Sequence, residues 1–402
     1  MDQLVNEIRP YAWGSTTALP GLMGSDPDGT PQAELWMGAH PAAPSRVRRP
    51  GGLLSLGALI GSGPTAELGE ATLRRFGPRL PFLLKLLAAE SPLSVQVHPD
   101  LAQAATGHRI ENSRGIPLDA PHRNYRDGNH KPEMIVAIGD FEGLCGFRSP
   151  AGCADLLDAL GLPELAPHTA ALRVEGEESA LRAVFAAFLA APPALVDAVA
   201  AATAREARGT GPYQPTFEAY DAVARAHPGD RGLLAAMMLR YFRLAPGEGL
   251  FLGAGVPHAY LRGLGVEIMA ASDNVLRCGL TSKHVDTEEL MRVVRFTPTP
   301  VRILRPTARG GEDVYPAPVD DFRLSRIRPS AGSAAVLDAT APQIIVCTRG
   351  RIRLTGPHGS LTLDPGGSAY TPAGEQVSVE GDGEAFRATV DAGRTRRAPS
   401  GS

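Results

Sequence analysis

The chain has 402 residues with 40 basic and 43 acidic side chains, a net charge of −3, and enough length for two or three domains. Apart from a short Arg-rich tail it has no block of like charge, which argues against a nucleic-acid or membrane-surface partner. The four cysteines show no CxxC spacing, so neither a disulfide framework nor a thiolate zinc site is expected.

The N-terminal residues carry acids and no apolar core, so we expect no signal peptide. The longest apolar run, residues 80–89, is interrupted by Lys85 and is too short to span a bilayer. We therefore expect a cytoplasmic, reduced protein whose cysteines act as small apolar residues.

The first 150 residues contain short apolar runs separated by Gly, Pro and Asp, a pattern typical of many short strands. The clearest runs are 81–87, 93–97 and 133–138. Gln96 and His98 lie two apart in an apolar, β-branched run, so on a strand both side chains leave the same face.

Two further residues of ligand type lie downstream in apolar surroundings, Glu133 and His258. Together with Gln96 and His98 they supply a carboxylate, an amide oxygen and two imidazoles, a set that suits Zn²⁺ or another first-row divalent metal. The alternative is three unrelated strands whose polar residues face a polar interior. Neither an HxH nor an HExxH signature is present to decide between them.

Residues 151–242 are alanine-rich and helical in pattern. Apolar residues at helical spacing predict a helix over 178–189, which ends before two consecutive prolines. A second helix is predicted from Asp230, a candidate N-cap, with one apolar face that includes two methionines and reaches Tyr241. We interpret those methionines as core filler.

After residue 300 a third region has short, turn-punctuated runs typical of a small β-barrel or sandwich. The predicted strands are 343–347, 351–354, 360–363 and 368–370. Its only histidine, His358, falls in a predicted hairpin loop, so we expect no second metal site and favour a structural or dimerising role for this region.

Strand–turn–histidine elements inside a jelly roll are the cupin arrangement. We therefore predict a mainly β protein with an α insertion, made of two cupin-like jelly-roll domains and one helical domain. The expected boundaries are a catalytic domain split between 1–150 and 243–300, a helical insertion at 151–242, a C-terminal domain at 301–392 and a disordered tail at 393–402.

Five sequence blocks, in order, resemble those of the type I mannose-6-phosphate isomerase (phosphomannose isomerase) family. The last contains the run Val-Glu-Ile-Met-Ala-Ala-Ser-Asp-Asn-Val-Leu-Arg, the most distinctive of them. The blocks are residues 11–15, 31–41, 92–100, 129–134 and 256–286. The helical middle and the C-terminal region carry little of the resemblance.

The resemblance implies one zinc ion per chain, held by Gln96, His98, Glu133 and His258. It also implies interconversion of mannose 6-phosphate and fructose 6-phosphate through a cis-enediol, within mannose metabolism and GDP-mannose biosynthesis. The partner would be a small-molecule sugar phosphate, and we expect a monomer.

Arg277 is our candidate for the cation beside the sugar oxygens, because its guanidinium is always charged and fork-shaped. The alternative for Arg277 is a salt bridge with Asp273 or Glu267. A carboxylate between apolar neighbours, such as Glu267, has the raised pKa that suits acid–base work. The sequence does not choose among the candidates for proton transfer, which are Glu267, Asp273, His130 and Lys131.

The phosphate needs cationic or hydroxyl donors away from the reacting carbons. Lys283 and Ser94 match family positions that resemble phosphate contacts, and Lys85 and Lys131 are further options. Trp13 and Tyr260 are candidates for the pocket wall, although buried aromatic side chains are more often plain core.

Two rival functions belong to other classes. One is a related cupin metalloenzyme such as a dioxygenase, but that chemistry favours histidine-rich ligation with open iron positions. The other is a non-catalytic protein that binds another sugar phosphate; loss of Arg277, Glu267 or a metal ligand would have favoured it, and all are present.

Overall fold

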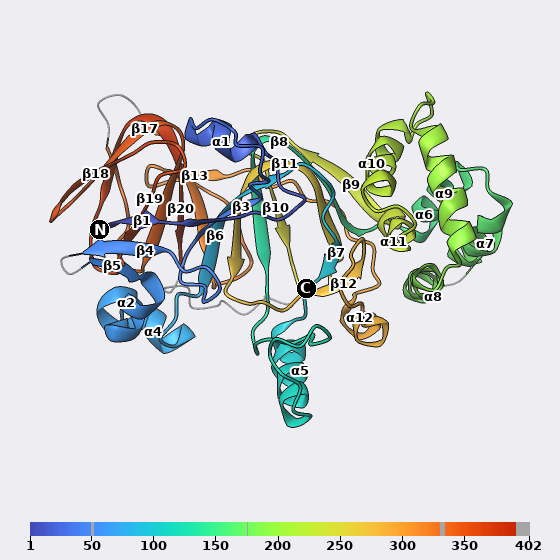
Figure 1. The fold of residues 1–402 in the computed structure, drawn as a ribbon, viewed down its shortest axis with the longest axis horizontal. Coiled ribbons are helices and arrows are strands. Elements are labelled where there is room, and N and C mark those ends of the chain that lie inside the picture. Colours follow the sequence, from blue (N-terminus) through green and yellow to red (C-terminus); the bar gives the residue numbers. More distant parts are fainter. Residues whose placement is uncertain (50–51, 175, 330–333, 391–402) are drawn as a thin grey trace, which may run out of the picture.

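The computed structural model describes residues 1–49, 52–174, 176–329 and 334–390. The tail predicted at 393–402 lies outside these residues. Within them the fold is mainly β, with two large antiparallel sheets and a cluster of helices at one end (Figure 1), which confirms the predicted fold class.

The sheet that carries the candidate site has the strand order β10-β8-β11-β6-β3-β2. Strand β9 pairs with β8, and β7 lies between β11 and β12. The bounds are β2 Glu7–Arg9, β3 Glu34–Met37, β6 Phe82–Ala89, β7 Val95–Val97, β8 Glu133–Phe147, β9 Leu239–Leu244, β10 Gly249–Leu252, β11 His258–Ala270 and β12 Leu276–Gly279.

The second sheet has the order β13-β14-β15-β20-β17-β19-β1-β4-β5, with β16 on β20 and β18 on β17. The bounds are β1 Asp2–Val5, β4 Arg46–Arg49, β5 Gly52–Ser55, β13 Thr307–Arg309, β14 Glu312–Val314, β15 Arg323–Ile327, β16 Ala335–Val336, β17 Gln343–Gly356, β18 Gly359–Leu363, β19 Ser368–Thr371 and β20 Ser378–Thr389.

Three N-terminal strands of this second sheet come from the segment that we expected in the catalytic domain. β1 pairs with β19 through Asp2↔Tyr370 and Gln3↔Ala369, and β4 then pairs with β1. Local sequence pattern does not report a partner more than 360 residues away, so this exchange between the two β regions was not foreseen.

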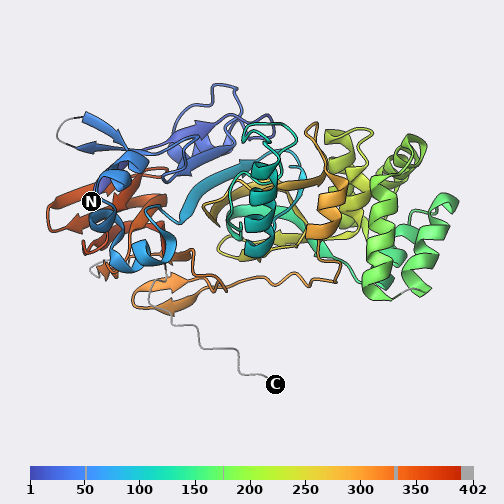
Figure 2. The same ribbon diagram turned by 90° about the horizontal axis from the view of Figure 1, so that it is seen from below.

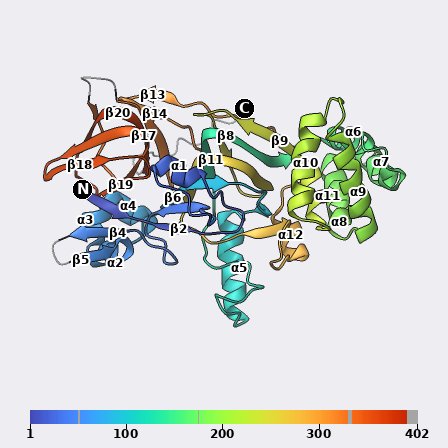
Figure 3. The same ribbon diagram turned by 45° about the horizontal axis from the view of Figure 1, so that its top comes forward.

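Helices α6 to α11 form one lobe at the end of the molecule, whereas α5 projects from the body (Figures 2 and 3). The bounds are α1 Ala18–Met23, α2 Leu56–Ser62, α3 Pro64–Leu68, α4 Glu70–Phe76, α5 Leu101–Ser113, α6 Pro150–Asp158, η1 Pro163–Leu165, α7 Ala166–Val174, α8 Glu177–Leu189, α9 Pro193–Glu206, α10 Gln214–Ala226, α11 Gly232–Met237 and α12 Thr287–Val293.

The predicted helix over 178–189 is confirmed as α8. The helix predicted from Asp230 is shorter than expected, because α11 ends at Met237 and Tyr241 already belongs to β9. In α11, a Cβ on Gly232 would lie 2.4 Å from the backbone nitrogen of Leu280, so the glycine allows close packing against the end of β12. This contact fixes the strand that carries Arg277.

Apolar side chains from both sheets share one core, including Leu84 and Ile268 from the first sheet and Ile344 and Phe386 from the second. Burial of this surface joins the two sheets into one body. In the C-terminal region the predicted strands at 343–347 and 351–354 are one strand, β17, with a register shift after Cys347, and His358 lies in the hairpin that follows.

Among the described helices, none is by itself long and apolar enough to cross a membrane. Taken together, α8 and α9 have the length and apolar composition of a membrane span, but the two helices meet at an angle of 105°.

Candidate metal centre and active site

Neighbouring strands of the first sheet bring the four predicted metal ligands together. Gln96 on β7 and His258 at the start of β11 are paired in register, and His98 follows directly after β7. Glu133 is the first residue of β8, the strand that lies beside β11. The spacing predicted a common face for Gln96 and His98, and the pairing of β7 and β8 with β11 brings Glu133 and His258 to them.

A buried cluster of His98, Glu133 and His258 has its ligand atoms within 4.8 Å of one another. His98 Nε2 lies 3.3 Å from Glu133 Oε1, and His258 Nε2 lies 3.4 Å from Glu133 Oε2. All three side chains are almost inaccessible to solvent.

Backbone carbonyls orient both imidazole rings. His98 Nδ1 lies 2.9 Å from the carbonyl of Asn274, and His258 Nδ1 lies 3.0 Å from that of Val256. Because a carbonyl can only accept, each Nδ1 carries a hydrogen, which leaves Nε2 of each ring as the atom that can bind a metal.

These donor atoms fit a divalent cation. Burial lowers the pKa of His98 to about 4, against the opposing charge of Glu133, so the ring is neutral near pH 7. His98 Nε2 is buried and has no hydrogen-bond partner among the described residues. Two imidazole Nε2 atoms and a carboxylate that converge in one buried place match a zinc site.

Gln96 is placed to add an oxygen to this set. Its side-chain Nε2 donates to Ser94 Oγ at 3.3 Å, which leaves Oε1 free to face the cluster. The residue lines the same cavity as Glu133 and His258.

A cavity of about 1140 Å³ lies over the cluster. Most of the residues predicted from the sequence line it, so the fold brings together candidates from many segments. The predicted residues on its wall are Trp13, Lys85, Ser94, Gln96, Lys131, Glu133, His258, Tyr260, Glu267, Asp273, Arg277 and Lys283. His98 does not line it, because its ring lies behind the wall.

The structure places His130 elsewhere. Its Nε2 lies 3.0 Å from Asp321 Oδ2, and it does not line the cavity. We expected His130 near the site because it precedes Glu133 by three residues. In extended chain, however, successive side chains point to opposite sides. Lys131 therefore reaches Glu133 Oε1 at 3.3 Å, while His130 turns away toward Asp321.

A buried ion-pair group forms one wall of the cavity. Lys85 Nζ lies 3.3 Å from Glu34 Oε1 and 3.2 Å from Glu267 Oε2, and Trp36 Nε1 donates to Glu34 at 2.6 Å. Burial raises the pKa of Glu267 to about 7, although Lys85 opposes this. The pKa of Lys85 is raised because Glu34 and Glu267 outweigh the effect of burial. Lys85 is thus an internal counter-ion as well as a cavity residue.

Lys85→Met should lower the free energy of unfolding by about 3 kcal/mol, because two carboxylates would be left buried without their cation. Chemical denaturation measures this. Arg74→Met is the matched control, since Arg74 and Glu70 form an exposed pair whose loss should cost less than about 0.5 kcal/mol. Equal unfolding midpoints for the two variants would contradict the assignment.

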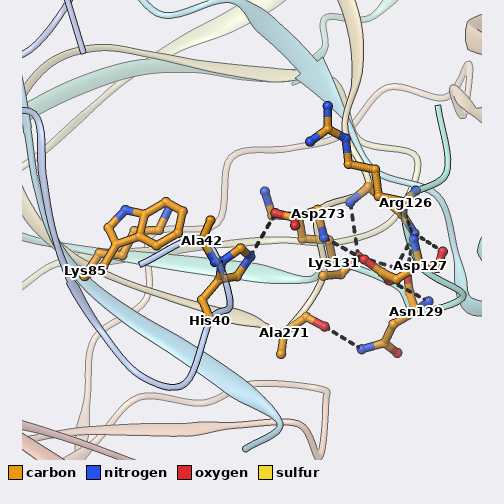
Figure 4. A network of polar contacts seen from close by, with 12 residues as sticks. His40, Ala42, Lys85, Arg126, Asp127, Asn129, Lys131, Ala271 and Asp273 are labelled. Atoms are coloured by element: carbon orange, nitrogen blue, oxygen red, sulfur yellow. Dashed lines mark hydrogen bonds and ion pairs between the residues drawn. The ribbon is translucent and has the colours of Figure 1, made fainter. Parts of the chain in front are cut away.

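Asp273 faces the cavity and is paired with His40, a residue that sequence reasoning did not single out. His40 Nδ1 accepts from the backbone N–H of Ala42 at 3.2 Å, so its Nε2 carries the hydrogen and donates to Asp273 Oδ1 at 3.0 Å (Figure 4). Burial works against ionisation, but the hydrogen bond from His40 keeps the pKa of Asp273 below its usual value. In the turn that contains Asp273, Ser272 Oγ accepts a hydrogen bond from the backbone N–H of Asn274 at 3.2 Å.

Arg277 on β12 is in register with Gln96 and lines the cavity. Neither Asp273 nor Glu267 forms an ion pair with it in the described part of the chain, so the alternative salt bridge is not present there. Arg126 lies near by and was not predicted. Its loop has no periodicity or motif that could have marked it.

Tyr260 and Trp13 complete the wall. The Tyr260 hydroxyl is buried and unpaired among the described residues, and burial raises the pKa of Tyr260 well above its usual value. Trp13 stacks on Tyr11 with ring centroids 5.6 Å apart.

Comparisons with known proteins agree on one family. A family model described as phosphomannose isomerase type I, catalytic domain, matches residues 1–150. The chain is 38% identical to a mannose-6-phosphate isomerase of Escherichia coli, covering 96% of this chain and 99% of that protein. It is 33% identical to the Bos taurus mannose-6-phosphate isomerase, over 93% of each.

Solved structures show the same likeness. A variant of phosphomannose isomerase from Salmonella typhimurium superposes with a TM-score of 0.89 at 37% identity, covering 97% of this chain and 99% of that one. A mannose 6-phosphate isomerase described as bound with zinc and yttrium gives a TM-score of 0.87 at 37% identity, with the same coverage.

Proposed function

This chain belongs to the type I mannose-6-phosphate isomerase (phosphomannose isomerase) family, and we propose that it interconverts mannose 6-phosphate and fructose 6-phosphate with a zinc ion. The observation that carries the proposal is the convergence of two imidazoles and a carboxylate beside a cavity whose wall holds cations that have no carboxylate partner among the described residues. Gln96, His98, Glu133 and His258 would hold the zinc, one ion per chain.

The reaction moves a carbonyl group from C1 to C2 of an opened sugar. A proton must leave C2, a cis-enediol must be stabilised, and a proton must return to C1. Zinc, when bound, supplies a Lewis acid for the sugar oxygens. Arg277 adds a fixed positive charge at the same end of the cavity, because its strand is in register with that of Gln96.

We assign the proton transfer to Glu267. Glu267 lies on the cavity wall, and burial raises the pKa of its carboxyl to about 7. Such a pKa suits a group that must both accept and return a proton near neutral pH. The ammonium of Lys85, 3.2 Å away, stabilises the ionised form of Glu267, so that part of the Glu267 carboxyls can accept a proton. Asp273 stays ionised under its hydrogen bond from His40, and Lys131 is engaged with Glu133, so both are better placed to orient the sugar hydroxyls.

We assign the binding of the phosphate to Lys283 and Ser94, which both line the cavity. The side chains of Trp13 and Tyr260 would form part of the wall around the sugar. We also propose that the protein works as a monomer in the cytoplasm on this soluble substrate; size-exclusion chromatography with light scattering tests the first point.

The test of the function is a coupled assay for fructose 6-phosphate formed from mannose 6-phosphate by purified protein. Turnover at a rate typical of metabolic enzymes, about 1–10³ s⁻¹, is the expected result. A zinc-loaded sample without turnover would contradict the proposal and would favour a related cupin metalloenzyme or a binder of another sugar phosphate.

His130→Ala should leave kcat within about threefold of the parent, since the imidazole contacts Asp321 rather than the cavity. Lys131→Met, at the neighbouring position, changes a cavity residue and should lower kcat/KM much more. Steady-state kinetics on the two variants, made side by side, decides the point. A fall in kcat/KM for His130→Ala as large as that for Lys131→Met would return His130 to the mechanism.

A further inference from the structure

Three basic side chains from three separate segments line the cavity close enough to act on one another. Arg126 comes from the loop before β8, Arg277 from β12 and Lys283 from the segment after β12. Thr281 and Ser282 line the cavity beside them. The family resemblance drew attention to Arg277 and Lys283, whereas nothing has assigned a role to Arg126.

None of the three cations has a carboxylate partner in the part of the chain that the structure describes. Asp127, the acid adjacent to Arg126, is occupied by other groups: the hydroxyl of Ser272 at 2.9 Å and the backbone N–H of Asp273 at 2.8 Å. In Figure 4 the guanidinium of Arg126 carries no dashed contact and extends away from the network around Asp127.

The three charges act on one another. Burial lowers the pKa of Lys283, and the positive charges of Arg277 and Arg126 lower it further. Burial also lowers the pKa of Arg277, and the positive charge of Arg126 lowers it further. Arg277 is partly buried, whereas Arg126 and Lys283 are exposed to solvent. Three neighbouring cations without a carboxylate partner among the described residues favour an anionic group beside them, which suits a phosphate.

The backbone of Arg126 is fixed to the metal centre through one buried residue. The N–H of Arg126 donates to Asn274 Oδ1 at 2.8 Å, and Asn274 Nδ2 donates to the carbonyls of Asp127 and Asn129 at 2.7 and 2.8 Å. The carbonyl of the same Asn274 orients His98. The loop of Arg126 is therefore held at a set position relative to the metal ligands.

We propose that Arg126 is a further substrate-binding residue, which together with Lys283 binds the phosphate of the sugar phosphate. The inference rests on the proposed function. A guanidinium offers a two-pronged donor that matches phosphate oxygens, and the ammonium of Lys283 supplies a second charge. Arg126 thereby selects phosphorylated over unphosphorylated sugar, while Arg277, which is paired in register with Gln96, lies between this phosphate site and the metal ligands and serves the reacting carbons.

The test compares Arg126→Ala and Arg126→Lys with Arg114→Ala, an exposed arginine at the end of α5 that does not line the cavity. Zinc-loaded proteins are titrated with inorganic phosphate by calorimetry, and KM and kcat are measured with mannose 6-phosphate. Arg126→Ala should raise the phosphate Kd and the KM by about tenfold to a hundredfold with little change in kcat. Arg126→Lys should recover part of the loss, and Arg114→Ala should match the parent.

Unchanged phosphate affinity and KM in Arg126→Ala would overturn the proposal, as would a parent protein that binds no phosphate. A fall in zinc content together with kcat would also overturn it, because the loop would then have only a structural role. The titration needs no turnover, so a parent that binds phosphate without isomerising mannose 6-phosphate would refute the proposed function and leave the assignment of Arg126 testable.

Discussion

Replacing Arg277 with alanine is expected to lower kcat by about 10²–10³ while zinc content stays at the parent level. Arg277 stands in register with Gln96 and lines the cavity, but its side chain makes no ion pair with the carboxylates that flank it in the described structure. A half-buried guanidinium that has no carboxylate partner among the described residues can stabilise negative charge that develops on the substrate.

The measurement combines steady-state kinetics with zinc analysis of the same preparation. Arg277→Lys is the informative control, since it keeps the charge but loses the planar fork and should recover only part of the rate. Turnover unchanged in Arg277→Ala would remove this residue from the mechanism.

Replacing His98 with alanine is expected to remove zinc and activity together. The ring is fully buried, it is oriented by the carbonyl of Asn274, and its Nε2 has no other partner in the described residues. Loss of a residue that merely orients a ligand costs roughly 10- to 100-fold in metal affinity, so loss of the ligand itself should cost more.

His358→Ala is the matched control, because His358 lies in the exposed turn between β17 and β18. It should keep parent levels of zinc and turnover. Stoichiometric zinc in purified His98→Ala would contradict the ligand assignment, whatever its activity.

Local pattern identified the four candidate ligands, and the family resemblance then favoured a metal site over polar side chains that face a polar interior. Gln96 lies on a short strand and His98 directly after it, so period-two spacing predicted that these two side chains leave the same face. Their meeting with Glu133 and His258, which each begin a strand, depends on strand pairing. The same logic located β6, β7 and β8, whose cores are runs of apolar residues.

The residues that were missed depend on tertiary contacts. Glu34, His40 and Arg126 reach the cavity from segments far apart in sequence, and no local feature distinguishes them from surface charges. His130 shows the reverse error, since nearness in sequence to Glu133 did not put its side chain in the cavity. The pairing of β1 with β19 likewise depends on how the two sheets meet, and neither the spacing of apolar residues nor strand propensity reports this.

The most direct test of the account is the rate of fructose 6-phosphate formation from mannose 6-phosphate in one preparation, assayed before chelation, after chelation, and after zinc is restored. Activity that disappears on chelation and returns in proportion to zinc, up to one ion per chain, is the result predicted here. Activity that persists at full rate in protein shown to be free of metal would contradict the role given to Gln96, His98, Glu133 and His258.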